Sequence, residues 1–305
     1  MQRNLGEAAT ALGLADHVYA RATERVPKLL GQIGVTINAN IERSAALLGL
    51  GKTDLVKMAL AHPVLFYQRP ETLLANAKAS AGKVGLDLAD FVRAAQKEPQ
   101  LLSRNPDTIG NASVGNAAAL ALDVGTFVRR ALRWPQLLHQ RPETSRRNLA
   151  RLAELLGVKR NALIKAAALQ PALLFQTPET VAARIDKTAT LLNIPYEDMV
   201  GLALQQPALF YQKPETIMGN VTSSAALLGI TQARFLQCAL PRPALFCMKP
   251  QTLRANIDGA AALLGVDSET IIAAALEQPY IFARKPAAIV CIKWLVERVI
   301  GRQSP

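Results

Sequence analysis

Residues 207–243 read PALFYQKPETIMGNVTSSAALLGITQARFLQCALPRP, and this stretch decides the fold because variants of it fill almost the whole chain. It opens on Pro207, and Pro243 opens the next copy 36 residues later. The same spacing joins eight prolines: Pro27, Pro63, Pro99, Pro135, Pro171, Pro207, Pro243 and Pro279. A second proline follows seven residues later in seven of the eight copies. Tandem units of this kind stack in a line, and each buries its apolar face against its neighbours.

We number the copies as repeats 1 to 8 and give each residue its distance from the opening proline, so that Lys213 lies at position +6 of repeat 6. Apolar residues at +2 and +3 predict a short buried turn of 3₁₀ type. The second proline, usually followed by Glu and Thr, predicts the start of a long first helix, because proline suits the first helical turn and an acidic residue favours the positive helix end. Apolar residues at +10, +14, +18 and +21 share one face of this helix.

The end of the first helix is marked at position +22 by Asn193 and five glycines, and Ala121 alone departs: the glycines are Gly49, Gly85, Gly157, Gly229 and Gly265. Glycine or asparagine is typical of a left-handed residue that stops a helix. A second helix is expected next, with apolar residues at +28, +29, +32 and +33. Its N-cap is predicted at Asp87, Asp123 and Asp267. This second helix must stop before the next proline. No run of alternating polarity indicates a strand anywhere in the sequence.

The pattern therefore predicts one all-α domain over residues 1–305, a right-handed type of α-solenoid or superhelix built of tandem 36-residue helical repeats. Each repeat would contain two α-helices and a short 3₁₀-like turn. Residues 1–26 are expected to form an N-terminal cap half-repeat, in which 11–26 is a lone second helix. Residues 27–278 would form seven full repeats, and 279–305 a truncated C-terminal capping repeat.

Composition limits the location of the protein. The net charge is +12 and the hydrophobic content is 50%, yet no segment has the roughly 20 apolar residues of a membrane span. The N-terminal segment lacks an apolar signal core and carries acidic residues, which argues against a transit peptide. Three thiols without metal-ligand spacing suggest packing residues in a reducing intracellular compartment: Cys238, Cys247 and Cys291. We expect the cytoplasm of a bacterium, or an organelle or host nucleus if the protein is delivered there.

Position +6, just before the second proline, is basic in five of seven repeats: Arg69, Arg141, Lys213, Lys249 and Lys285. A cation at a helix N-terminus opposes the helix dipole, so it does little for stability. The same place suits a phosphate group, which the free N–H groups of the helix also attract. A row of phosphate contacts is the favoured interpretation, and a solvated loop residue is the alternative.

Further positive charge lies at position +30, in Lys57, Arg93, Arg129 and Lys165. The densest segment is 129–151, where Glu143 alone opposes seven arginines: Arg129, Arg130, Arg133, Arg141, Arg146, Arg147 and Arg151. Helical spacing would place Arg129 with Arg133 on one face, and Arg147 with Arg151. Like charges this close repel, so binding of a polyanion explains them better than solubility does. Such binding would weaken with salt.

Three further positions could contact a nucleic acid or have a purely structural role. Asparagine recurs at +13, in Asn40, Asn76, Asn148, Asn220 and Asn256. Asparagine can contact a base edge, but a residue that reads bases should vary, so we expect a buried amide bonded to the neighbouring repeat's backbone. Positions +4 and +11 do vary, which fits either base readout or unconstrained surface.

Catalysis is not indicated. His17, His62 and His139 lack the local spacing of a zinc or nucleophile site, the glycines are used at helix ends, and no isolated carboxylate pair suggests acid–base chemistry. We therefore expect no enzyme activity, no catalytic residues, no metal, no cofactor and no membrane partner, in a monomeric protein.

The repeat resembles that of the mitochondrial transcription termination factor (mTERF) family, on residues such as Pro135-Gln136-Leu137-Leu138 followed by Leu155-Leu156-Gly157-Val158. The resemblance covers nearly the whole chain and implies a curved superhelix whose basic groove binds duplex DNA, or RNA in some members. It also implies a role in transcription. The chain departs from the family in its regularity, in its second proline with Glu-Thr, and in lacking a transit peptide. Its regularity is similar to that of one-repeat-per-base DNA readers, so a bacterial protein delivered into a host cell is also an open interpretation.

The leading hypothesis is therefore a non-enzymatic protein that binds nucleic acid, duplex DNA in preference to RNA, through a basic groove. The alternative is a protein-interaction scaffold, a bacterial effector among them, in which the variable columns hold a partner.

Overall fold

The computed structural model describes residues 2–290, and within them every regular element is a helix. By its internal contacts the chain comprises two compact units, residues 1–147 and 148–305, and the boundary falls inside helix α9. We call them the N-terminal and C-terminal units and describe each by itself. The all-α class predicted from the sequence is confirmed.

The long first helix of each repeat begins at the second proline, or at Gly34 in repeat 1: α3 (Gly34–Leu48), α5 (Pro70–Val84), α7 (Pro106–Ala119), α9 (Pro142–Leu156), α11 (Pro178–Leu192), α13 (Pro214–Leu227), α16 (Pro250–Leu264) and α18 (Pro286–Val290). The second helices are shorter: α4 (Lys52–Ala61), α6 (Leu88–Lys97), α8 (Val124–Ala131), α10 (Arg160–Leu169), α12 (Tyr196–Gln205), α14 (Gln232–Ala239) and α17 (Ser268–Glu277). Both starts agree with the prediction from proline and N-cap residues.

The turn at the opening proline is a 3₁₀ helix in seven places: η1 (Pro27–Gly31), η2 (Pro63–Phe66), η3 (Pro99–Leu102), η4 (Pro135–Leu138), η5 (Pro171–Leu174), η6 (Pro207–Phe210) and η7 (Pro279–Ile281). At Pro243 the turn is instead a short α-helix, α15 (Ala244–Cys247). Pro241 precedes it and follows the end of α14 closely, because a proline has no main-chain N–H with which to continue the helical hydrogen bonds.

The chain begins with two helices, α1 (Gln2–Ala11) and α2 (Asp16–Arg25), joined at Gly13. The sequence pattern predicted α2 but made no prediction for α1. At the other end, most of the predicted cap, residues 291–305 with Cys291, lies outside the described residues.

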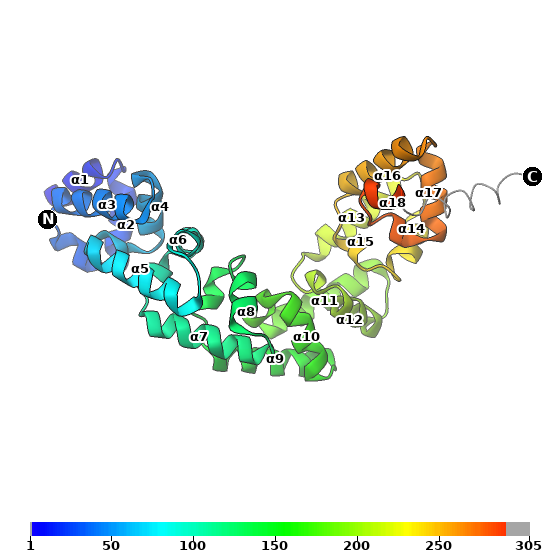
Figure 1. Ribbon diagram of the computed structural model, residues 1–305, viewed down its shortest axis with the longest axis horizontal. Coiled ribbons are helices and arrows are strands. Elements are labelled where there is room, and N and C mark those ends of the chain that lie inside the picture. Colours follow the sequence, from blue (N-terminus) through cyan, green and yellow to red (C-terminus); the bar gives the residue numbers. More distant parts are fainter. Residues whose placement is uncertain (1, 291–305) are drawn as a thin grey trace, which may run out of the picture. The chain divides into compact units, whose positions relative to one another are not determined.

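Neighbouring helices pack in sequence order (Figure 1). In the N-terminal unit α1, α3, α5 and α7 each contact the next, and in the C-terminal unit α11, α13, α16 and α18 do so. Each of these first helices that is followed by a second helix also packs against it. First helices therefore form one layer in each unit and second helices the other.

The core lies between these layers at the predicted apolar positions. The residues at +3 of repeats 2 to 8 are buried without exposed surface, among them Phe66, Phe210 and Phe246. Those at +10 are equally buried: Ile37, Leu73, Ile109, Ser145, Val181, Ile217 and Leu253. Ser145 is the only polar member of that column, and its hydroxyl has no hydrogen-bond partner.

The helix stops also follow the sequence. All five glycines at +22 and Asn193 have positive φ, which confirms the predicted left-handed cap. Ala121 adopts the same conformation with φ of 53° although it carries a Cβ. The side chains of Asp87, Asp123 and Asp267 each accept a hydrogen bond from the main-chain N–H three residues later, as predicted for N-caps.

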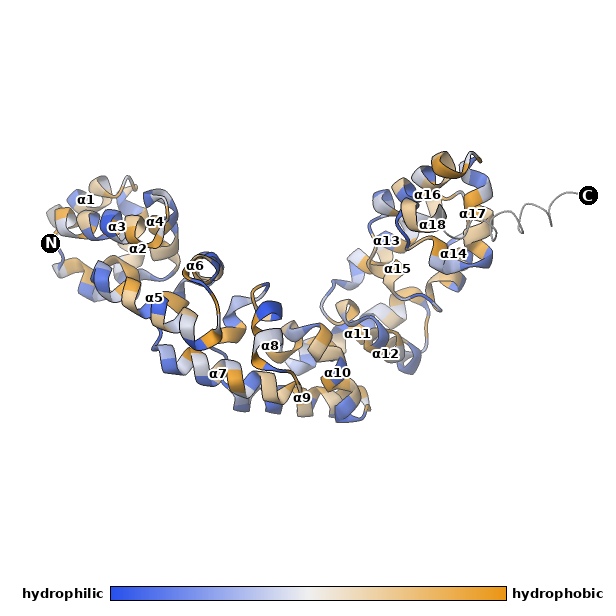
Figure 2. Cartoon of the chain, in the orientation of Figure 1, coloured by the Kyte–Doolittle hydropathy of each residue, from blue (hydrophilic) through white to orange (hydrophobic). Residues whose placement is uncertain are grey.

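Hydrophilic and hydrophobic residues are interspersed along the long helices (Figure 2). Among residues 2–290 no single helix has the length and apolar composition to cross a membrane. The consecutive pair α16 and α17 meets that test only when the two are joined across a 112° bend.

Candidate nucleic-acid interface

The basic residues at +6 lie at the N-terminus of a first helix. Arg69, Lys213 and Lys249 are the N-cap residues of α5, α13 and α16, with extended backbone angles near φ −69° and ψ 136°. The following proline imposes this conformation, because it excludes the residue before it from helix. Each cation therefore lies beside the first helical turn. In α13 and α16 the N–H groups of Thr216 and Thr252 in that turn already bond to the carbonyls of Lys213 and Lys249, at 2.9 and 3.0 Å.

All five of these side chains are exposed: Arg69, Arg141, Lys213, Lys249 and Lys285. Within residues 2–290 none of them forms an ion pair or a side-chain hydrogen bond. Two of the five lie in the N-terminal unit and three, on consecutive repeats, in the C-terminal unit. Their charge is therefore free to meet an anion.

The basic residues at +16 behave differently. Arg43 contacts Glu71 of the next repeat at 2.6 Å, Arg151 contacts Glu179 at 3.0 Å, and Lys187 pairs with Glu215. In each pair the carboxylate follows the second proline, 28 residues after the cation. Main-chain and side-chain hydrogen bonds, the latter from Arg151, hold the pKa of Glu179 below its ordinary value. These ion pairs join neighbouring repeats, so the cations at +16 are neutralised by carboxylates of the protein itself.

The residues at +30 are exposed on the second helices, but most of them have partners. Lys57 lies 3.8 Å from Asp54, Arg93 pairs with Asp90, and Arg129 donates to the Thr126 hydroxyl at 2.9 Å. Lys165 has no such partner among the described residues. Fewer of the basic residues at +30 than of those at +6 are therefore unpaired.

The arginine-rich segment is divided between α8, the following turn and α9. Arg133 was expected to share a helical face with Arg129, and this is wrong: α8 ends at Ala131, and Arg133 lies in the turn with its guanidinium 5.0 Å from the Trp134 ring centroid. Pro135 restricts only Trp134 directly. The second helices α4, α6, α10 and α12 all end two residues before their proline, so α8 ends two residues earlier than they do. Arg130 is half-buried.

On α9, Arg146 lies 3.5 Å from Glu143, and Arg151 contacts Glu154 as well as Glu179. Arg147 is exposed and forms no ion pair within the described part of the chain. The cluster predicted from the sequence is therefore partly neutralised, and Arg147 is its clearest free charge on α9.

Three of the five asparagines at +13 make the predicted bond to the neighbouring repeat, although the side chains are half-buried and not fully buried. Asn148, Asn220 and Asn256 donate their amides to the carbonyls of Leu174, Phe246 and Phe282, each 26 residues later, at 3.0–3.5 Å. In repeat 5, Arg184 makes the same bond to Phe210 at 3.1 Å. The amide joins a first helix to the turn of the next repeat.

The variable residues at +4 contact the preceding repeat. Ser103 bonds to His62 at 2.7 Å, and His139 lies 3.5 Å from Glu98, in both cases 41 residues apart. Burial lowers the pKa of His62 and His139. Burial also raises the pKa of the Cys247 thiol, at the same position, to about 11. The side chains of Ser103 and His139 are thus engaged in contacts between repeats.

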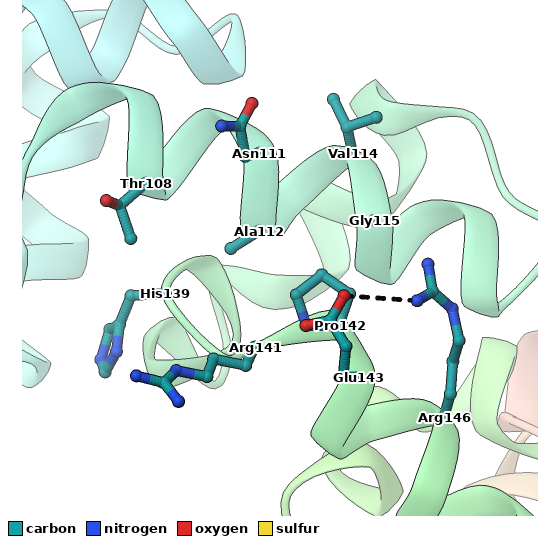
Figure 3. Close-up of a pocket in the computed structure, with 10 residues that line it drawn as sticks. All are labelled: Thr108, Asn111, Ala112, Val114, Gly115, His139, Arg141, Pro142, Glu143 and Arg146. Carbon is teal, nitrogen blue, oxygen red and sulfur yellow. Dashed lines mark hydrogen bonds and ion pairs between the residues drawn. The ribbon is translucent and has the colours of Figure 1, made fainter.

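A hollow of about 490 Å³ lies in the N-terminal unit between α7 and the start of α9 (Figure 3). It brings together three of the predicted features, Arg141, Arg146 and His139. The α7 side is formed by residues that sequence reasoning did not select: Thr108, Asn111, Ala112, Val114 and Gly115. The sequence does mark this place, because Ala112 and Gly115 occupy positions +13 and +16, where several other repeats have an asparagine and a basic residue.

Among residues 2–290, no group of three or more His, Cys, Asp or Glu side chains is placed to hold a metal ion. Comparison with protein-family models gave no match for this chain, and a search of curated proteins found no relative.

Proposed function

We propose that the chain is an α-solenoid of 36-residue repeats, similar to the mTERF family, that binds nucleic acid without catalysing a reaction. Duplex DNA is the preferred ligand over RNA, and the role is in transcription or gene expression. The observation that carries this proposal is the contrast between positions +6 and +16. Cations at +16 are paired between repeats, whereas those at +6 are exposed and unpaired at helix N-termini.

That contrast favours an external anion. If basic residues were present only for solubility, ion pairs like those at +16 would be expected at +6 as well, since Glu71, Glu143 and Glu215 each lie two residues after a +6 cation. An unpaired cation at a helix N-terminus destabilises its own helix slightly, whereas the positive end of the helix dipole and the cation together stabilise a bound phosphate. The C-terminal unit offers this arrangement at Lys213, Lys249 and Lys285 on consecutive repeats.

The spacing fits contact with a backbone rather than one base per repeat. Packed helices lie about 8–10 Å apart, and one strand of DNA rises about 3.4 Å per nucleotide. Cations on adjacent repeats would therefore be roughly three nucleotides apart along a straight duplex. Such contacts position a duplex without reading its sequence.

The decisive experiment is an electrophoretic shift with duplex DNA, single-stranded DNA and RNA over a salt series. We expect the duplex to bind most tightly and the affinity to fall steeply with salt. In the variant Lys213→Ala/Lys249→Ala, the slope of log affinity against log salt should decrease by roughly 1.8, about 0.9 for each lost phosphate contact.

The matched control is Lys187→Ala/Arg254→Ala, which removes the same charge from the same unit but from side chains paired with Glu215 and Asp258. Its slope should change less. Absence of binding to all three nucleic acids at about 50 mM salt would exclude the proposal.

One observation favours the alternative, a protein-interaction scaffold. Leucines at +20 are exposed on three first helices of the C-terminal unit: Leu191 by 40%, Leu227 by 41% and Leu263 by 56%. A second hollow of about 390 Å³ beside Leu191 is lined by Met218, Leu236 and Leu240. An apolar surface of this kind suits an amphipathic partner helix. Substituting these leucines by glutamine without loss of nucleic-acid binding would separate the two functions.

A further inference from the structure

The hollow between α7 and α9 exists because repeat 3 departs from the pattern of the other repeats. At +13, where Asn148, Asn220 and Asn256 reach the next repeat, repeat 3 has Ala112. At +16, where Arg43, Arg151 and Lys187 form ion pairs, it has Gly115. The missing amide at +13 leaves space at this junction. Gly115 instead lets α7 come close to the next repeat, since a Cβ there would lie 2.3 Å from the ring of Pro142.

The junction is held together in a different way. Asn116 is fully buried and donates to the carbonyls of Leu137 and Gln140 at 3.3 and 2.8 Å. Four other repeats have serine or threonine at this position: Ser44, Ser80, Thr188 and Ser224. The bond lost at Ala112 is thus replaced one helical turn later, and the space at Ala112 is retained.

The ion pairs between a cation at +16 and a carboxylate of the next repeat also set this junction apart. Repeats 6 and 7 lack the +16 cation, with Ser223 and Gly259, and the next repeats lack the carboxylate as well, with Gln251 and Ala287. Repeat 2 also has an uncharged residue at +16, an alanine, but Lys83 of the same helix pairs with the next carboxylate, Asp107, at 2.9 Å. At the junction after repeat 3 the carboxylate of Glu143 is kept opposite Gly115, and its cation comes from its own helix.

The core beneath this junction is also altered. Ser113 at +14 and Ser145 at +10 are fully buried where most repeats have Ile, Leu or Val, and neither hydroxyl has a partner. Departures that weaken packing at one place in a regular repeat are typical of functional sites, where the structure retains what stability alone would remove.

The lining has two kinds of surface. Ala112, Val114 and Pro142 are apolar, and Val114 is 55% exposed. Arg141 and Arg146 lie on opposite sides of Pro142 (Figure 3), and Asn111 and Thr108 add hydrogen-bonding groups from α7. Glu143 can accept a hydrogen bond from a hydroxyl or amino group. The two arginines give the lining an excess of positive charge, and arginine binds phosphate through paired N–H groups.

We propose that this hollow binds one nucleotide: Arg141 holds its phosphate, its organic part rests against Ala112, Val114 and Pro142, and Arg146 donates to the organic part from the other side of Pro142. A volume of about 490 Å³ lies within the usual range of small-ligand sites. The nucleotide is either a free nucleoside monophosphate or an unstacked nucleotide of a longer chain, because both present the same groups. The site does not depend on the row of cations at +6 beyond Arg141.

The test is calorimetric titration of the full chain with a nucleoside 5′-monophosphate of each base, the parent nucleosides, inorganic phosphate and a 5′-phosphorylated single-stranded oligonucleotide. We expect a monophosphate to bind more tightly than its nucleoside and than phosphate. Tighter binding of the oligonucleotide than of any monophosphate would assign the nucleotide to a chain, and the reverse would assign it to a free ligand. Absence of monophosphate binding at millimolar concentration, or equal affinity for inorganic phosphate, would overturn the proposal.

Variants locate the site. Arg141→Gln and Arg146→Gln should each weaken binding about tenfold to a hundredfold, the effect of losing a charged hydrogen bond. Ala112→Asn restores the residue of the other repeats and should abolish binding by filling the hollow. Lys213→Gln is the matched control, since it removes the equivalent +6 cation at a junction where the side chains of Arg184 and Lys187 are present at +13 and +16.

Unchanged affinity in both arginine variants would overturn the assignment. Both residues are exposed, so these variants are informative even if Ala112→Asn does not fold. If the protein binds a nucleoside monophosphate but no duplex DNA, the proposed function is contradicted. The proposal of a nucleotide site in this hollow is then still supported.

Discussion

Gly115 lies so close to Pro142 that a Cβ on the glycine would be 2.3 Å from Cγ of the proline ring. The ring cannot move aside easily, because Pro142 begins α9 and its φ is fixed. We therefore expect Gly115→Ala to destabilise the protein by about 1–3 kcal/mol, as overpacking does. The measurement is the free energy of unfolding in urea.

The control for that variant is Gly219→Ala. Gly219 is also inside a first helix, α13, but a Cβ there would meet nothing within 4 Å. It should stabilise the protein by about 0.5–1 kcal/mol, since alanine is the better helix former. Effects of the same sign at both positions would contradict the close contact.

Ala121 stands at the left-handed helix stop that glycine or asparagine fills elsewhere, and its φ is 53°. A Cβ in this conformation costs roughly 1–2 kcal/mol. Ala121→Gly should therefore raise the free energy of unfolding by about 1 kcal/mol. Ala118→Gly, at an exposed position inside α7, should lower it by about 0.5–1 kcal/mol. A loss of stability in both variants would show that Ala121 is not strained.

The amide of Asn220 donates to the carbonyl of Phe246 at 3.0 Å and joins α13 to the next repeat's turn. Asn220→Ala should destabilise the C-terminal unit by about 1–3 kcal/mol, because the carbonyl loses its partner. Asn220→Asp keeps the size but cannot donate, so it should be no more stable than the alanine variant. Asn111→Ala, at an exposed position on α7, should change stability by less than about 0.5 kcal/mol. Chemical denaturation followed by circular dichroism would measure all three.

Stability should fall as the pH decreases through the range where histidine titrates. Burial lowers the pKa of His62 and His139 in the folded protein. The unfolded chain, with an ordinary pKa of about 6.5, then binds protons at a pH where the folded protein does not. The stabilisation is complete above about pH 6.5 and is lost as the pH falls through the lower folded pKa values.

The measurement for this prediction is the urea midpoint between about pH 8 and pH 5. The variant His62→Gln/His139→Gln should flatten the upper part of that profile. A wild-type midpoint that rises as the pH falls toward 5 would contradict the direction of both shifts.

Arg147 and Arg151 lie one turn apart on α9 but differ in their partners. Arg151 contacts Glu179 of the next repeat, whereas Arg147 forms no ion pair within residues 2–290. Arg147→Ala should therefore weaken nucleic-acid binding more than Arg151→Ala, and Arg151→Ala should reduce thermal stability more. Electrophoretic shifts and melting curves on the same two proteins would test this. Equal effects on binding would mean that Arg151 leaves Glu179 when nucleic acid is present.

The helices and the core could be predicted from the sequence because local chemistry fixes them. Proline before Glu-Thr starts the first helix, Gly or Asn stops it, and Asp87, Asp123 and Asp267 start second helices. The exceptions arise where a local rule gives no signal. Helix α1 has no proline at its start, and Arg133 falls outside α8 although its spacing from Arg129 suits a helix.

The sequence by itself determined the repeated elements, their boundaries and which columns carry positive charge, because these depend on residues close together in the chain. Only the tertiary structure decided which charges are free. The partners of Arg43 and Arg151 are 28 residues away, and the residues around the hollow come from α7 and α9. Such contacts depend on how one repeat packs on the next. For this reason the sequence alone does not distinguish a basic residue at +16, which forms an ion pair between repeats, from one at +6, which is unpaired.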